Sequence, residues 1–239
     1  MTEREKRFID EKYHNDSERL NAYKRLEDHE PLAYILGEWY FYDEKYLLNE
    51  ETLIPRSDTE ILVEQSIKYI PRDGVFIDLC TGSGCVAISI LAHRPDLKAV
   101  AVDISQGALE MAKRNAALNA VDDRIDFLCA DLLDANFANV FDKRFDALTS
   151  NPPYINSSVI PTLAPELARE PHIALDGGED GLTFYRRIFD LCPALLKDKS
   201  PILLEIGYDQ ADALKRIFKS GEIVRDYGGC DRVFLHNHK

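Results

Sequence analysis

Short, continuously apolar segments alternate with amphipathic ones from residue 75 to the end of the chain. Helical periodicity fills most of the intervals, for example at Cys85–Ala92 and Ala108–Leu118. Apolar strands separated by helices are typical of an α/β protein whose parallel sheet is covered on both faces. The segment Glu222–Leu235 predicts two further strands, an antiparallel hairpin at the sheet edge. The five parallel strands that we predict are Val75–Leu79, Ala99–Val102, Ile125–Cys129, Phe145–Leu148 and Ile202–Ile206.

The first 56 residues have a different pattern. Residues 2–30 are polar and charged with sparse apolar positions, which predicts one or two short helices. The aromatic run Trp39–Tyr42 lies between turn residues and favours a β-hairpin. Ser57 and Glu60 have the spacing of a capping box, so we expect a helix to begin there. The expected parts are a short N-terminal helical segment at 1–30, a β-hairpin linker at 31–56 and a larger α/β domain at 57–239.

Composition narrows the class of protein. The chain has 239 residues, of which 45% are hydrophobic and 30% are charged, as in a soluble globular protein. No apolar run approaches the ~20 residues of a membrane span, and the N-terminus has no secretory signal. We therefore expect a cytoplasmic protein with no membrane partner. The five cysteines form no CxxC pair and the six histidines show no ligand spacing, so we predict no metal site.

The formal net charge of −13 argues against one class of partner. A protein that grips a nucleic-acid backbone needs a basic face, because binding releases the counterions of the phosphates. The sequence contains no cluster of lysines and arginines. Direct nucleic-acid binding is therefore disfavoured.

A glycine-containing loop, Asp78–Gly84, joins the first predicted strand of the sheet to the next helix. Glycines at such a turn let a ligand approach the backbone closely. Asp103 ends the second strand, 21 residues after Gly82, where a carboxylate reaches two vicinal ribose hydroxyls. Because Gly82–Ala87 also fits the GxGxxA pattern of dinucleotide folds, an NAD-dependent oxidoreductase stays open. The candidate cofactor-binding residues are Cys80, Thr81, Gly82, Ser83, Gly84, Asp103, Asp131, Leu132 and Asn151.

The tetrapeptide Asn151-Pro152-Pro153-Tyr154 follows the fourth predicted strand, at the same edge of the sheet. Each proline stiffens the backbone and lacks an N–H group, which leaves carbonyl oxygens free to accept hydrogen bonds. An amide side chain, a free carbonyl and an aromatic face within four residues suit the binding of a planar NH₂ group. A turn that merely ends a strand is the alternative.

Together these motifs resemble class I S-adenosylmethionine methyltransferases that modify a planar nitrogen. Asn-Pro-Pro-Tyr is shared by adenine-N6 DNA, guanine-N2 RNA and protein glutamine-N5 methyltransferases of that group. Further motifs resemble the release-factor glutamine N5-methyltransferases, the HemK/PrmC family. These further motifs are Glu30–Gly37, Leu53–Glu60, Glu170-Pro171, Ala174–Leu182 and Asp226–Val233. The resemblance implies a Rossmann-like seven-stranded methyltransferase fold, with residues 57–239 as the S-adenosylmethionine-binding catalytic domain.

The resemblance also implies an activity. The methyl group of S-adenosylmethionine would go to the side-chain nitrogen of the glutamine in the Gly-Gly-Gln motif of class 1 peptide chain release factors, leaving S-adenosylhomocysteine. Asn151, Pro152 and Tyr154 would be catalytic, and with Pro153 they would bind the substrate amide. A nucleic-acid amino-group methyltransferase and a catalytically idle binding module remain alternatives.

Two departures from the family bear on these expectations. About 30 residues precede the predicted hairpin, fewer than in the N-terminal helical domain that the family usually carries. Cys80 stands where the family has glycine before Thr81. We expect the Cys80 backbone to contribute to the loop if its φ stays negative.

Overall fold

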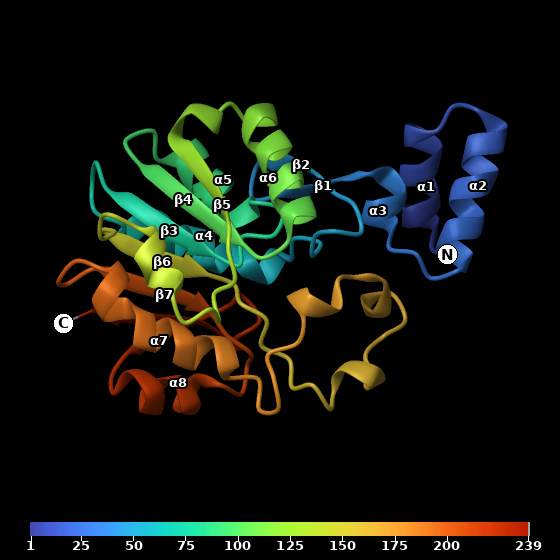
Figure 1. Cartoon of the computed structure of the whole chain (residues 1–239). Coiled ribbons are helices and arrows are strands. Elements are labelled where there is room, and N and C mark those ends of the chain that lie inside the picture. The colour runs from blue at the N-terminus through green and yellow to red at the C-terminus, as the bar shows by residue number, and fades with distance from the viewer. Residues whose placement is uncertain (239) are drawn as a thin grey trace.

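A seven-stranded sheet forms the centre of the computed structural model, which describes residues 1–238 (Figure 1). Its strand order is β5-β4-β3-β6-β7-β9-β8. Neighbouring strands from β5 to β7 are parallel, while β9 is antiparallel to both of its neighbours. The strands are β3 (Val75–Leu79), β4 (Lys98–Asp103), β5 (Ile125–Cys129), β6 (Ala147–Ser150), β7 (Pro201–Glu205), β8 (Glu222–Arg225) and β9 (Asp231–Asn237). The predicted seven-stranded α/β fold and its terminal hairpin are confirmed, with β8 as the edge strand.

Five helices cover the two faces of this sheet. Alternate residues of a strand point to opposite faces, so Phe76 belongs to the core under α4 and α5, and Ile77 to the core under α7 and α8. Figure 1 shows α7 and α8 together on one side of the sheet. The helices are α4 (Glu60–Tyr69), α5 (Cys85–His93), α6 (Gln106–Leu118), α7 (Thr183–Leu195) and α8 (Ala211–Phe218). Short 3₁₀ helices lie at Ser57–Thr59, Asp122–Arg124, Phe137–Val140, Ile160–Thr162, Leu167–Arg169 and His172–Ala174.

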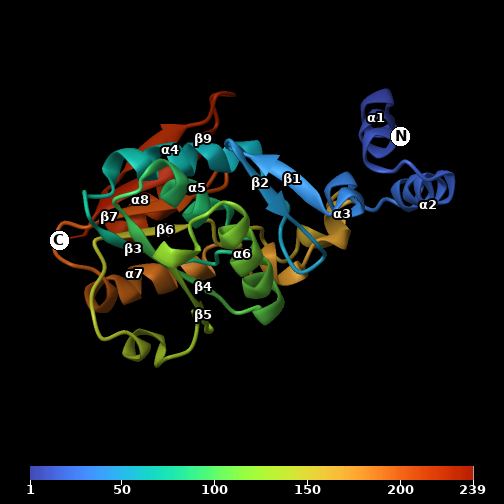
Figure 2. The same cartoon turned by 90° about the horizontal axis from the view of Figure 1, so that it is seen from above.

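The N-terminal helices stand apart from the sheet, as Figures 1 and 2 both show. They have a small core of their own, formed by Ile9, Ala22 and Ile35. The part of 31–56 predicted only as a hairpin begins with a helical turn before its two strands. These N-terminal elements are α1 (Glu3–Lys12), α2 (Asp16–Glu27), α3 (Leu32–Leu36), β1 (Glu38–Phe41) and β2 (Glu44–Leu47). Tyr46 of β2 is fully buried and its hydroxyl lies 2.7 Å from Ser89 Oγ, which anchors the hairpin on α5.

The entry into α4 differs from the prediction. Residues 57–59 form a 3₁₀ turn and the α-helix begins at Glu60, without a side-chain cap, so the capping box of Ser57 and Glu60 is wrong. Glu60 instead accepts a hydrogen bond from the Tyr42 main-chain N–H (3.0 Å) in the hairpin turn. The extra turn places Thr59 in the interior, where it is 2% exposed.

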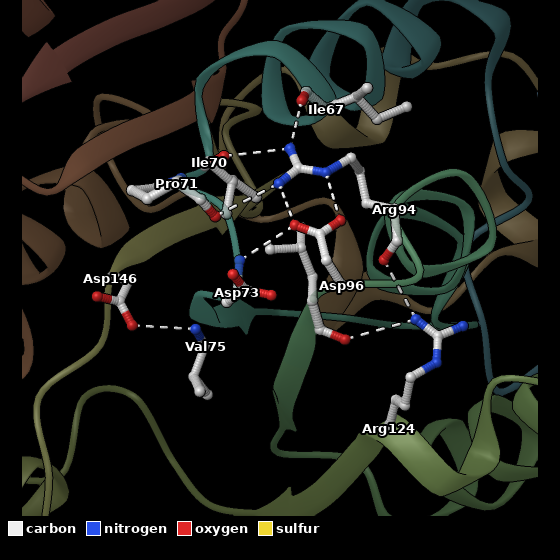
Figure 3. A network of polar contacts seen from close by, with 10 residues as sticks. Ile67, Ile70, Pro71, Asp73, Val75, Arg94, Asp96, Arg124 and Asp146 are labelled. Carbon is white, nitrogen blue, oxygen red and sulfur yellow. Dashed lines mark hydrogen bonds and ion pairs between the residues drawn. The ribbon is translucent and has the colours of Figure 1, made fainter.

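Arg94, between α5 and β4, forms a network of polar contacts near the amino ends of β3 and β4 (Figure 3). Its guanidinium forms a two-pronged ion pair with Asp96, with N···O distances of 2.8 and 2.6 Å. It also donates to the main-chain carbonyls of Ile67, Ile70 and Pro71, at the end of α4. The same guanidinium holds the pKa of Asp96 well below its usual range. This network is therefore a structural clamp between the ends of α4 and α5.

Within residues 1–238, no helix is long and apolar enough to cross a membrane.

Candidate active site

Two cavities meet at the carboxyl ends of the parallel strands. The first, of about 220 Å³, extends across the ends of β3, β4, β5 and β6, and the second, of about 150 Å³, lies on the Tyr154 side. Asn151 lines both of them. The predicted site residues in the first cavity are Cys80, Gly82, Asp103, Asp131, Leu132, Asn151 and Pro153. Those in the second are Asn151, Pro152 and Tyr154.

The glycine loop is held by its own polar contacts. Gly82 has a φ of +55° and donates its N–H to Asp103 Oδ2 (2.8 Å), which fixes the loop against the end of β4. Gly84, with a φ of +81°, serves packing: a Cβ there would lie 2.7 Å from Ile88 Cδ1. The predicted residues Thr81, Ser83 and Gly84 lie in the loop but are not among the residues that line the first cavity.

Asp78 supports the loop from below. It is 1% exposed, and its two carboxylate oxygens accept hydrogen bonds from the hydroxyls of Thr81 and Thr149, each at 2.7 Å. Burial raises the pKa of Asp78 to about 6, and the two hydroxyls oppose that rise. Because both oxygens are already engaged, Asp78 acts as a buried brace of the loop.

The backbone of Cys80 differs from the one that the sequence led us to expect. Its φ is +58°, in the left-handed region, so the expected negative φ is wrong. The usual cost of that region for a residue with a Cβ is about 1–2 kcal/mol. Burial also raises the pKa of the thiol well above its usual value, so the side chain is a neutral, apolar part of the cavity wall. The turn therefore keeps a glycine-like backbone although it lacks the glycine.

Asp103 and Asp131 occupy the predicted places after neighbouring strands. Asp103 accepts hydrogen bonds from the main-chain N–H groups of Gly82 and Ser105, at 2.8 and 3.0 Å. Burial raises its pKa in spite of these bonds. Asp131 is exposed and accepts from the Leu133 N–H (2.8 Å), while its neighbour Leu132 is 6% exposed. The cavity thus has a fixed acid on one strand end and an apolar surface on the next.

Sequence reasoning missed part of the wall of the first cavity. The residues concerned are Glu51, Leu53, Ile173 and Phe184. Leu53 and the segment around Ile173 belong to or adjoin the family motifs quoted above, but a motif alone does not show which cavity a side chain faces. Leu53 lines both cavities. The linker therefore contributes to the site directly.

A buried acid fixes this linker. Glu170 is 6% exposed and lies in the loop between β6 and α7, the yellow-to-orange segment beneath the linker in Figure 1. Its carboxylate accepts from the Ile54 main-chain N–H (3.0 Å) and from the Arg56 guanidinium. The linker and the loop between β6 and α7, which both line the cavities, are therefore joined to each other.

At the junction of the cavities, the orientation of the Asn151 amide is set by Thr59. Asn151 Nδ2 donates to Thr59 Oγ1 (3.3 Å). An amide has its donor and acceptor on opposite branches, so Asn151 Oδ1 remains available as an acceptor. Thr59 was not among the predicted site residues.

Tyr154 and Glu205 form the far side of the second cavity. The Tyr154 hydroxyl donates to Glu205 Oε1 (3.4 Å), and burial raises the pKa of Tyr154. Glu205 ends β7, is 2% exposed and has a pKa raised to about 7, mainly by burial. Glu205 was also missed, although an acid at the end of an apolar strand is the signal that identified Asp103.

Known proteins are similar to this chain in sequence and in fold. A family model described as "Methyltransferase small domain" matches residues 57–179. The release factor glutamine methyltransferase of Thermodesulfovibrio yellowstonii is 43% identical, across 86% of this chain and 76% of that protein. The chain belongs to the release factor glutamine methyltransferase family. Membership confirms the family predicted from the motifs and favours methyl transfer over the oxidoreductase that the glycine pattern left open.

Two further relatives place the chain within this family. It is 36% identical to a bifunctional methyltransferase of Rickettsia felis and spans 48% of that longer protein. The solved structure of a release-factor-specific protein-(glutamine-N5) methyltransferase from Alicyclobacillus acidocaldarius is 30% identical, with a TM-score of 0.50. It covers 81% of this chain and 99% of its own. The methyltransferase fold is therefore shared with an enzyme of the same family.

Proposed function

We propose that this protein methylates the side-chain amide nitrogen of the glutamine in the Gly-Gly-Gln motif of class 1 peptide chain release factors, with S-adenosylmethionine as donor. The observation that carries the proposal is the meeting of two cavities at Asn151. One cavity has the strand-end acid and apolar wall suited to an adenosyl group. The other has the acceptors suited to an amide. Residues 57–239 would be the catalytic domain, with residues 31–56 as the linker and residues 1–30 as an N-terminal helical segment.

A few side chains of the first cavity would hold S-adenosylmethionine. Asp103 would accept hydrogen bonds from the ribose hydroxyls, and the buried Leu132 would pack on the adenine ring. Asp131 would accept a hydrogen bond from the adenine amino group, and Cys80 and Gly82 line the cavity at the loop. When bound, S-adenosylmethionine supplies an electrophilic methyl group.

The second cavity would bind and orient the substrate amide. An amide nitrogen is a poor nucleophile because its lone pair is delocalised. Asn151 Oδ1 and the Pro152 carbonyl would accept its two N–H groups, with Tyr154 against the amide plane. Holding the nitrogen in a near-attack geometry supplies much of the rate increase. Fixed acceptors also stabilise the positive charge that develops on nitrogen.

Methyl transfer to a purified class 1 release factor tests the proposal. We expect the wild-type chain to add one methyl group to the glutamine of the Gly-Gly-Gln peptide, located by mass spectrometry. A release factor with alanine at that glutamine is the matched control and should remain unmodified. DNA and RNA offered as acceptors should take no methyl group. A chain that binds S-adenosylmethionine but leaves the release factor unmodified would refute the proposed substrate. The cytoplasmic location of the protein remains a prediction.

A further inference from the structure

Glu205 is a buried acid in the cavity that would hold the substrate amide. It is the last residue of β7, all of whose residues are buried. Its side chain lines the second cavity together with Asn151, Pro152 and Tyr154. Burying a carboxylate costs free energy unless hydrogen bonds or charges compensate. A structural role alone would be served at lower cost by a neutral amide of the same shape.

The two oxygens of Glu205 have different surroundings. Oε1 accepts the hydrogen bond of the Tyr154 hydroxyl (3.4 Å). Oε2 is buried and has no well-formed hydrogen bond among residues 1–238. Tyr154 therefore engages one oxygen of a carboxylate that lines the cavity, while the other oxygen has no well-formed hydrogen bond.

Groups from two other elements, β9 and the 3₁₀ turn at residues 57–59, act on this carboxyl. Arg232 of β9 lowers the pKa of Glu205, as does the hydroxyl of Thr59, while Asp58 raises it. Arg232 is itself engaged by Asp226 and Asp58, at 3.1 and 3.2 Å. No cation among the described residues pairs with Glu205 within ion-pair distance, so the charge is compensated only in part.

Neutral groups complete the surroundings. From α7, the Tyr185 hydroxyl donates to the Glu205 main-chain oxygen (2.8 Å) rather than to the carboxyl. Burial keeps the pKa of Tyr185 well above its usual value, and raises that of Cys85 on α5 to about 12. Neither group ionises near neutrality. Glu205 is thus the acid in this cavity that can gain and lose a proton near pH 7.

The proposed reaction needs such a group. Methylation gives the amide nitrogen a fourth bond, in addition to those to the acyl carbon and two hydrogens, so one proton must leave. Asn151 Oδ1 and the Pro152 carbonyl accept hydrogen bonds, but amide oxygens are too weakly basic to retain a proton. Resting on the proposed function, we infer that the Glu205 carboxylate is the base that accepts the proton released from the substrate nitrogen.

Proton transfer to Glu205 would follow the transfer of the methyl group to nitrogen. The substrate nitrogen forms a bond to the methyl carbon while the carbon–sulfur bond breaks and its electron pair goes to sulfur. An N–H bond then breaks, its electron pair stays on nitrogen, and the proton joins the Glu205 carboxylate. Glu205 later releases that proton to solvent. The product is a neutral N-methyl amide and the carboxylate is restored.

The pH dependence of kcat for Glu205→Gln tests this inference. Wild-type kcat should rise with pH through about 7 and then level off, because only the carboxylate accepts a proton. The Gln variant should lose this rise, and its kcat should fall by roughly 10²–10⁴-fold, the range typical of a lost general base. Its affinity for S-adenosylmethionine should be unchanged. Glu222→Gln, the same change at an exposed site on β8, is the matched control and should keep the wild-type profile.

A shorter acid provides a second test. Glu205→Asp should be slower than wild type but keep the rise of kcat with pH, because it still has a carboxylate. A Gln variant with wild-type kcat and an unchanged profile would overturn the inference. A wild-type kcat that is flat between about pH 6 and pH 8 would do so without any variant. A wild-type chain that binds S-adenosylmethionine but methylates no release factor would overturn the proposed function, and this inference with it.

Discussion

Asn151 donates its side-chain N–H to the Thr59 hydroxyl over 3.3 Å, although 92 residues separate them in the chain. The donor side of the amide is thereby occupied. Its oxygen is left for a ligand at the point where the two cavities join. The 3₁₀ turn before α4 thus acts on the proposed chemistry without touching the first cavity.

Asn151→Ala should bind S-adenosylmethionine almost normally but lose turnover by roughly 10²–10³-fold, the usual effect of removing one preorganised polar group from a transition state. The reason is that the substrate amide loses an acceptor while the donor cavity keeps its other walls. Calorimetric titration with the cofactor and single-turnover methylation of a release factor separate the two effects. Near-normal turnover would mean that Asn151 does not hold the amide.

Thr59→Val keeps the shape of the side chain but removes the hydroxyl that orients Asn151. We expect kcat to fall by about tenfold, less than in Asn151→Ala, because the free amide still samples the productive orientation. In the double variant Thr59→Val/Asn151→Ala, the loss should be smaller than the two single losses added together, since the contact by which Thr59 orients Asn151 is then already absent and only its effect on the pKa of Glu205 remains. Additive losses in that double-mutant cycle would contradict the relationship.

Cys80→Gly should raise the free energy of unfolding by up to about 1 kcal/mol, because glycine adopts a φ of +58° without a steric penalty. Cys80→Ala is the matched control, since it also removes the thiol but retains a Cβ, and should not stabilise. Urea denaturation of the three proteins measures the difference. Cofactor affinity should be preserved in the glycine variant, whose backbone conformation is unchanged.

Arg94→Ala should lower the free energy of unfolding by about 1–2 kcal/mol, because it leaves partly buried carbonyls and Asp96 without their partner. Arg94 and Asp96 precede β4, whereas the cavities lie at the carboxyl ends of the parallel strands, so kcat at low temperature should be unchanged. A folded pKa below the unfolded value contributes stability that is lost as pH falls. The variant should therefore lose less stability than wild type on acidification below about pH 4. Denaturation curves at several pH values test both statements.

Glu205→Gln should make the fold more stable at alkaline pH. The folded pKa of about 7 exceeds the unfolded value of about 4.3, so this carboxyl contributes stability below the unfolded pKa that is lost as pH rises through 7. The difference in unfolding free energy between variant and wild type should therefore change by up to about 3 kcal/mol between pH 5 and pH 8. Parallel stability curves would show that the carboxyl does not titrate differently on folding.

The sequence predicted well those features that local pattern controls. Val75–Leu79 and Ile125–Cys129 are strands at the predicted bounds, because continuous apolar runs between polar turns suit strands buried on both faces. The fourth strand begins two residues later than predicted, since Phe145 makes only an isolated bridge, with Leu196. The predicted strand ends did bring Asp103, Asp131 and Asn151 to one cavity.

What the sequence did not predict depends on contacts between distant segments. The spacing of Ser57 and Glu60 fits a capping box, but Glu60 bonds the hairpin turn instead, and Thr59 turns inward. The Glu170 contact with Ile54 spans 116 residues, so no local pattern shows it. The φ of Cys80 is likewise set by the loop around it, against the preference of the residue.

Leu53 lies in the wall of both cavities, on a linker that Glu170 holds in place. Occupants of the two cavities would therefore contact the same side chain, and we expect their affinities to be coupled. Thermodynamic linkage makes that coupling reciprocal: whatever factor the methyl donor applies to the affinity for the substrate, the substrate applies to the donor. Conversion of S-adenosylmethionine to S-adenosylhomocysteine would change the contacts of Leu53 in the first cavity only. Through Leu53, the linker would therefore couple the binding of the methyl donor to the binding of the substrate.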